Sequence, residues 1–209
     1  MKNMKKLLSA FLLLGALVSC GGNTSSTPEG SVPAQVENKT ELDASLVGIA
    51  ANKTVHLTTV GQADSNIVSN VLNKAGATGE YTINTKLTAA EVGAGDVVFL
   101  TLGSSSKGLG DAGVDEASEK ARAQAFSAAA KAGNFTLILF HVGGTARRGT
   151  SSDPIIEAAF PGAKACFVVA AGNEDGFFTT LAGTNNVDLY SVAKTLDIVT
   201  FAKGLYGKE

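Results

Sequence analysis

Three uninterrupted apolar segments constrain the fold more than any other feature of this sequence. They read "DVVFLTLG" (residues 96–103), "FTLILF" (135–140) and "CFVVAAG" (166–172). Strands without alternating polar residues are typical of a parallel sheet whose two faces are both covered by helices. These segments therefore predict the central strands of an α/β sheet.

Segments with helical spacing of apolar residues separate these strands from one another and from shorter, more polar strands. Helices are predicted over residues 64–76, 115–133, 153–162, 175–183 and 193–207, and further strands over 54–60, 80–83 and 187–192. The segment 37–52 is left open as a strand, a helix or linker. The alternation predicts a three-layer α/β/α domain, flavodoxin-like or Rossmann-like, with a doubly wound, mostly parallel sheet of five to six strands. We expect the strand order 2-1-3-4-5 with a sixth strand appended, and the polar strands at the edges.

The N-terminus, "MKNMKKLLSAFLLLGALVSC", has the layout of a secretory signal: three lysines precede an apolar stretch too short to span a bilayer. Its end, "LVSC", resembles the lipobox of bacterial lipoproteins. The resemblance implies cleavage before Cys20 and attachment to a membrane through lipid on that cysteine. Gly21 follows instead of an aspartate, which favours the outer membrane. We therefore expect a location in the bacterial cell envelope, on the periplasmic side or the cell surface; an ordinary cleaved signal is the alternative.

The predicted boundaries follow from composition. Residues 1–19 are the signal peptide, 20–40 a lipid-attached flexible tether and 41–209 a single α/β domain. The tether is rich in Gly, Ser, Thr and Pro and has almost no large apolar residue. Cys166 would then have no disulfide partner, and its apolar surroundings predict a buried core thiol.

The charge balance argues against a nucleic-acid partner. Removing the three leader lysines from the 17 basic residues leaves 14, against 19 acidic residues. The chain also has three tyrosines and no tryptophan. Nucleic-acid binding requires a basic surface.

Four loops that follow predicted strands carry glycine and small polar residues: 61–65, 103–113, 143–153 and 172–176. In open parallel sheets, ligands bind beyond the carboxyl ends of the strands, where the strand order reverses. Glycines there let the backbone approach a ligand and expose its N–H groups. The alternative is that these glycines only form tight turns.

The charged residues of these loops suggest what binds. We expect Arg147 and Arg148 to be exposed and to grip an anionic group, with Lys107 adding a point charge. The predicted ligand-binding residues are Ser104, Ser105, Ser106, Lys107, Gly108, Gly143, Gly144, Arg147, Arg148, Asp153, Asn173 and Asp175.

The same loops resemble a known family. "GSSSKGLGDAGVDEASEKAR", "HVGGTARRGTSSDPIIEA" and "GNEDGFFTTLA" are similar to segments of domain-of-unknown-function family 6305. The resemblance covers about residue 53 to the C-terminus. It implies a shared site and names no reaction. The positions that it indicates are Ser104, Ser106, Lys107, Gly108, His141, Gly143, Gly144, Arg147, Arg148, Ser152, Asp153, Asn173 and Asp175.

Two functions are compatible with these features. The first is an extracytoplasmic binding protein for a small anionic or zwitterionic molecule, accessory to solute uptake and partnered by a transporter. The alternative is a hydrolase or transferase that uses a loop serine such as Ser106 with His141 and Asp153. A lone histidine at the end of a buried strand is more often structural, however.

We expect no cofactor and no metal. "GLGDAG" (108–113) fits the dinucleotide pattern G-x-G-x-x-G, but five residues separate it from its strand, which is not the first of the fold. Four aspartates near this edge could hold Mg²⁺, but helix capping accounts for each of them. They are Asp64, Asp115, Asp153 and Asp175.

Overall fold

The computed structural model describes residues 36–209. The predicted signal peptide, the lipidation site at Cys20 and most of the predicted tether lie outside the described residues. No helix in the described part is long and apolar enough to cross a membrane.

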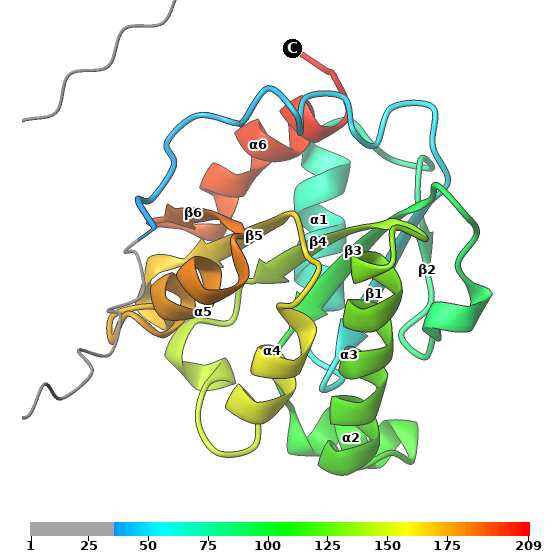
Figure 1. The fold of residues 1–209 in the computed structure, drawn as a ribbon, viewed down its shortest axis with the longest axis vertical. Helices are drawn as coiled ribbons and strands as arrows, with labels where there is room; N and C mark the ends of the chain where they lie inside the picture. The colour runs from blue at the N-terminus through cyan, green and yellow to red at the C-terminus, as the bar shows by residue number, and fades with distance from the viewer. Residues whose placement is uncertain (1–35) are drawn as a thin grey trace, which may run out of the picture. The chain divides into compact units, whose positions relative to one another are not determined.

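Six parallel strands form one sheet in the order β2-β1-β3-β4-β5-β6 (Figure 1). The strands are β1 (Val55–Val60), β2 (Thr82–Ile83), β3 (Val97–Leu102), β4 (Thr136–His141), β5 (Ala165–Val169) and β6 (Asp188–Val192). The predicted strand order and the predicted edge strands are confirmed. The order reverses between β1 and β3, which are neighbours although β2 separates them in the chain.

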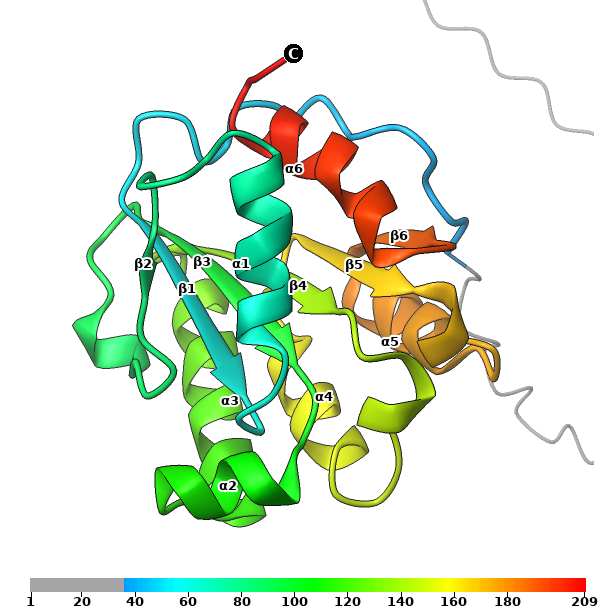
Figure 2. The ribbon, with the colours of Figure 1, turned by 180° about the vertical axis from the view of Figure 1, so that it is seen from behind.

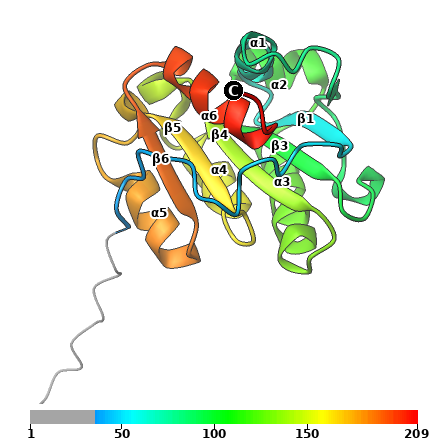
Figure 3. The same ribbon diagram turned by 90° about the horizontal axis from the view of Figure 1, so that it is seen from above.

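Helices cover both faces of this sheet, so the predicted three-layer α/β/α architecture is confirmed (Figure 3). One face carries α1 (Ser65–Lys74) and α6 (Ile198–Leu205), which lie in front in Figure 2. The other carries α3 (Glu116–Lys131), α4 (Asp153–Ala159) and α5 (Phe177–Asn185). Short 3₁₀ turns are η1 (Ala89–Glu91), η2 (Gly144–Arg147), η3 (Ala170–Gly172) and η4 (Thr195–Asp197).

Two hydrophobic clusters hold the layers together, because successive strand residues point to opposite faces. Phe99 and Phe140 belong to the cluster under α1 and α6, whereas Leu100 and Leu139 belong to the cluster under α3, α4 and α5. All four side chains are fully buried. The unbroken apolar pattern of the central strands therefore reflects burial on both sides.

One helix lies where a loop was predicted. The segment after β3 forms α2 (Ser106–Ala112), with Ser105 as its N-cap accepting a hydrogen bond from the Gly108 N–H. Two glycines within seven residues made this segment a poor helix candidate. Gly108 is needed for packing, since a Cβ there would lie 2.2 Å from the Gln62 carbonyl oxygen.

The folded domain begins earlier than residue 41. The Asn38 side chain both donates to and accepts from the Ser191 backbone, and the Lys39 N–H donates to Leu189 O. These bonds cover the open edge of β6. The last residues of the predicted tether are thus part of the domain. The segment 37–52 forms turns that run over α6, and the Gly48 N–H donates to Gly204 O.

Candidate functional site

The loops after β1 and β3 lie in direct contact at the point where the strand order reverses. A Cβ on Gly61 would lie 2.2 Å from the Gly103 carbonyl oxygen. Gln62 forms an isolated bridge with Ser104, and the Ser105 N–H donates to Gly61 O over 2.9 Å. The glycines at this junction therefore let the loops pack against each other.

The loop after β1 adopts an unusual backbone. Gln62 and Asp64 have φ values of 57° and 61°, in the left-handed region that non-glycine residues rarely adopt. Asp64 occupies the N-cap position of α1, but its side chain makes no capping hydrogen bond. The predicted capping role of Asp64 is wrong because its carboxylate turns to Arg147.

A buried ion pair holds this loop in place. Glu119 is 1% exposed and accepts hydrogen bonds from the Gly61 N–H over 2.6 Å and from the Gln62 amide over 3.2 Å. Arg122 binds the Glu119 carboxylate and donates to Leu87 O. This role of Glu119 is not predictable from the sequence, because an acid in the first turn of a helix is ordinary.

Arg147 lies at the junction and keeps part of its guanidinium unpaired. Its Nε–H points at both carboxylate oxygens of Asp64, each 3.2 Å away. Its aliphatic stem fills the space above Gly103 and Gly143, where a Cβ would lie 2.8 Å and 2.0 Å from stem carbons. The side chain is 32% exposed. Within residues 36–209 neither terminal nitrogen of Arg147 has a hydrogen-bond acceptor, which leaves four N–H groups free.

Arg148 points to the other side of the same turn and is saturated. It forms a two-bond fork with Asp153, a second fork with Asp175, and a hydrogen bond to Gly172 O. These contacts use all five guanidinium N–H groups. Its guanidinium carbon also lies 3.9 Å from the ring centre of Phe177. The side chain is only 12% exposed, so the expectation of an exposed Arg148 is wrong, and no N–H group remains for a ligand.

A cavity of about 300 Å³ lies beside Arg148. Its lining residues are Thr145, Arg148, Gly149, Asp153, Ala171, Gly172, Glu174 and Asp175. Hydrogen bonding to Arg148 lowers the pKa of the Asp175 carboxyl below its ordinary value, which keeps that group ionised. The carboxylates of Asp153, Glu174 and Asp175 line the cavity, and the Arg148 guanidinium has no N–H group left to donate, so binding of an anion in this cavity is disfavoured.

The other predicted residues of the loop after β3 do not converge on one site. Ser104 is buried with its hydroxyl unpartnered, while Ser105 caps α2. Ser106 and Lys107 are exposed on the first turn of α2, and the Lys107 ammonium pairs with Asp111 at 2.5 Å. The Lys107 side chain is 85% exposed, and the pair with Asp111 is its one ion pair in the described part of the chain.

The predicted residues of the last two loops form local hydrogen bonds within those loops and at the starts of the helices that follow. Asn173 Oδ1 accepts from the Phe178 N–H over 2.8 Å, which closes the start of α5. Asp153 is the first residue of α4 and not its N-cap, a position that Ser152 takes. The Asp153 carboxylate accepts hydrogen bonds instead from Arg148 and from the Gly149 N–H.

Among the predicted helix-capping aspartates, Asp115 caps α3 as expected, by accepting from the Ser118 N–H. The carboxylate of Asp175 accepts from the Phe177 N–H in the first turn of α5, beside the N-cap Gly176. Gly143 and Gly144 form the start of the η2 turn.

His141 does not form the serine–histidine–acid set. It is fully buried, and its two ring nitrogens lie 3.1 Å from Leu102 O and 3.1 Å from Gly144 O. No serine or carboxylate in residues 36–209 is hydrogen-bonded to it, and Ser106 is exposed on α2. The centre of the His141 ring lies 4.7 Å from the centre of the Phe178 ring. Burial lowers the pKa of His141, which makes it a poor base at this position.

Two further expectations concern a thiol and a metal. Cys166 is fully buried, as expected, and burial raises the pKa of its thiol. In the part of the chain that the structure describes, no group of three or more His, Cys, Asp or Glu side chains is arranged to hold a metal ion.

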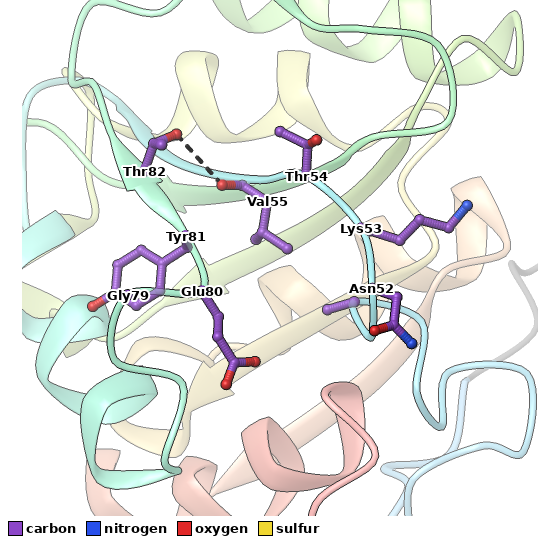
Figure 4. Close-up of a pocket in the computed structure, with 9 residues that line it drawn as sticks. Asn52, Lys53, Thr54, Val55, Gly79, Glu80, Tyr81 and Thr82 are labelled. Carbon is purple, nitrogen blue, oxygen red and sulfur yellow. Dashed lines mark hydrogen bonds between the residues drawn. The ribbon is translucent and has the colours of Figure 1, made fainter.

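A larger cavity, of about 430 Å³, lies at the opposite edge of the sheet (Figure 4). Its lining residues are Ala50, Asn52, Lys53, Thr54, Val55, Gly79, Glu80, Tyr81 and Thr82. Figure 4 shows the Lys53 and Tyr81 side chains pointing away on opposite sides, and Glu80 is paired with Lys208. Because no charged side chains converge there, we place the candidate site at the carboxyl edge, around Arg147.

Fold and site define a doubly wound α/β/α domain with an unpaired guanidinium edge at its switch point. The sequence matches the family described as Domain of unknown function (DUF6305) over residues 52–206. The chain therefore belongs to this family. No curated protein and no solved structure gives a significant match.

Proposed function

We propose that this protein is a lipid-anchored binding protein of the bacterial cell envelope that takes up a small anionic or zwitterionic molecule at the junction of β1 and β3. One observation carries the proposal. Within residues 36–209, four N–H groups of Arg147 have no acceptor, and they lie at the switch point of the sheet, where ligands bind in this architecture.

The chemistry of the junction suits an oxyanion. Asp64 fixes the Arg147 guanidinium through Nε, so that the edge formed by its two terminal nitrogens can make two parallel bonds to a carboxylate or phosphate. The N-terminus of α1, which begins beside Asp64, has no side-chain cap and adds partial positive charge. The negative charge of Asp64 makes the junction tolerant of a zwitterion as well.

The proposed location rests on the leader sequence. Lipid on Cys20 would hold the domain at a membrane, with the outer membrane favoured, and a transporter would be the receiving partner. Incorporation of labelled palmitate into the wild type, and its loss in Cys20→Ser, is the expected result. Equal labelling of both proteins would contradict the anchor.

A thermal-shift screen with phosphorylated, carboxylated and amino-acid metabolites tests the binding function. We expect a ligand that raises the melting temperature of the wild type in a concentration-dependent manner. Arg147→Ala should weaken that ligand about 10- to 100-fold, because hydrogen bonds to charged groups contribute about 1.5–3 kcal/mol.

Lys107→Ala is the matched control, since it removes an equal charge from an outward-facing position on α2. Binding that survives in Arg147→Ala would exclude the junction as the site. Equal loss in both variants would indicate attraction by overall charge without contact at Arg147.

A further inference from the structure

The buried side chain of His141 lies between two backbone carbonyl groups. Both ring nitrogens face carbonyl oxygens at hydrogen-bond distance, Leu102 O at the end of β3 and Gly144 O at the start of η2. A neutral imidazole has one N–H group and one lone pair. In the neutral form one of the two carbonyls therefore faces a lone pair, and only the imidazolium can donate to both.

The Gly144 carbonyl belongs to the turn that positions Arg147. The turn η2 spans Gly144–Arg147, and a backbone bond from the Arg148 N–H to Thr145 O closes its end. A second bond from His141 would tie the start of this turn to β3 through Leu102. The geometry of the proposed anion site thus depends on a group that gains a donor when it binds a proton.

We propose that His141 is a proton-operated latch: its protonation fixes η2 and so strengthens anion binding at Arg147. This inference rests on the proposed function, whose site it regulates. It requires no movement of His141 itself, only a change in the number of hydrogen bonds that the ring donates.

The groups around the ring set the direction of the effect. Burial among Phe178, Gly172 and the strand ends lowers the pKa of His141 below its ordinary value of 6.5, while the Gly144 and Leu102 carbonyls act in the opposite direction. Of the charged groups that face it, Arg148 lowers the pKa and Asp64 raises it. The latch is therefore open at neutral pH and closes on the acid side.

Two consequences follow by linkage. An anion bound at Arg147 favours the charged imidazole, so anion affinity rises as the pH falls through the pKa of His141, and the bound anion raises that pKa. Because the folded state binds this proton more weakly than the unfolded state does, the free energy of unfolding falls as the pH drops below about 6.5, and this fall ends once His141 is protonated in the folded state as well.

The decisive measurement is an NMR titration of the full-length protein carrying His56→Gln. The chain has only two histidines, so one imidazole signal remains. Amide hydrogen exchange of the η2 residues is followed over the same pH range, with the amides of α2 as the control for intrinsic pH dependence. We expect His141 to titrate in the folded protein and protection of the η2 amides to increase about fivefold or more as it does so.

Binding of sulfate, which keeps its charge over this range, is measured in parallel by calorimetry. Sulfate affinity should rise with the same midpoint in the wild type and stay flat in His141→Gln. Titration without added protection of η2, or a ring that stays neutral until the protein unfolds, would overturn the latch. Absence of sulfate binding at every pH would overturn the anion site, while the exchange data would still decide the latch.

Discussion

Arg147 and Arg148 are adjacent in the chain but belong to two different regions of the molecule. Arg148 joins the loops after β4 and β5 and donates all five of its guanidinium N–H groups to two carboxylates and a carbonyl. Arg147 lies between the loops after β1 and β3, and within residues 36–209 its guanidinium is hydrogen-bonded through Nε alone, to Asp64. The number of unpaired donors, and not the presence of an arginine, therefore makes Arg147 the candidate binding residue and Arg148 a structural one.

The two regions also differ in the charge around them. The Arg148 region contains Asp153, Glu174 and Asp175 around its cavity, so its surplus charge is negative. In the Arg147 region, Asp64 is paired with Arg147, and the start of α1 beside it has no side-chain cap. We therefore expect a ligand anion to be attracted to the Arg147 region and repelled by the Arg148 region.

The largest expected effect is on stability at Arg148. Arg148→Ala should lower the free energy of unfolding by about 3 kcal/mol, because it leaves Asp153, Asp175 and Gly172 O without their partner. Urea unfolding followed by circular dichroism measures this loss. Arg148→Lys should recover little of it, since an ammonium cannot form the two forks. A cost below about 1 kcal/mol, as for an exposed ion pair, would contradict a structural role.

The next effect sharpens the assignment of the Arg147 region. In Gly143→Ala the new Cβ would lie 2.0 Å from the Arg147 stem and 2.4 Å from an Asp64 carboxylate oxygen, so the pair must shift. We expect a loss of about 2 kcal/mol of stability, as in overpacked sites, together with weaker anion binding.

Gly110→Ala is the matched control for that substitution, because a Cβ there meets no atom within 4 Å. In the interior of α2 it should be neutral or stabilising by up to about 1 kcal/mol. Equal behaviour of the two alanine variants in unfolding and binding assays would remove the packing argument for Gly143.

The smallest effect concerns the exposed end of the Arg148 network. Asp175 is 63% exposed, so Asp175→Asn should cost only about 0.5 kcal/mol at neutral pH. Because Arg148 lowers the pKa of Asp175, the carboxylate contributes stability above its ordinary pKa of 3.8 and loses that contribution as the pH falls through the lowered value. Unfolding curves of wild type and variant should therefore converge in acid. A difference that stays constant down to pH 2 would contradict the ion pair.

Particular residues show how far sequence reasoning reached. The apolar strands, the edge position of β2 and β6 and the burial of Cys166 were predictable, because each depends on a pattern within a short segment. Asp64 was predicted to be a helix cap, with Mg²⁺ binding as the alternative, although its place on the loop after β1 put it at the switch point of the predicted sheet. The role of Glu119 in holding the loop after β1 could not be predicted, because its partners Gly61 and Gln62 are 58 and 57 residues away in the chain.

By itself, the sequence determined the layers, the strand order and the edge of the sheet at which the glycine-rich loops gather. These features depend on the hydrophobic pattern within short segments, because that pattern dictates which side chains are buried. Only the tertiary structure decided which arginine is free and where His141 points. Those outcomes depend on hydrogen bonds between loops, such as the bond between Asp64 and Arg147 across 83 residues of chain. A guanidinium has the same five donors wherever it stands, and the neighbours that folding brings to it determine how many remain for a ligand.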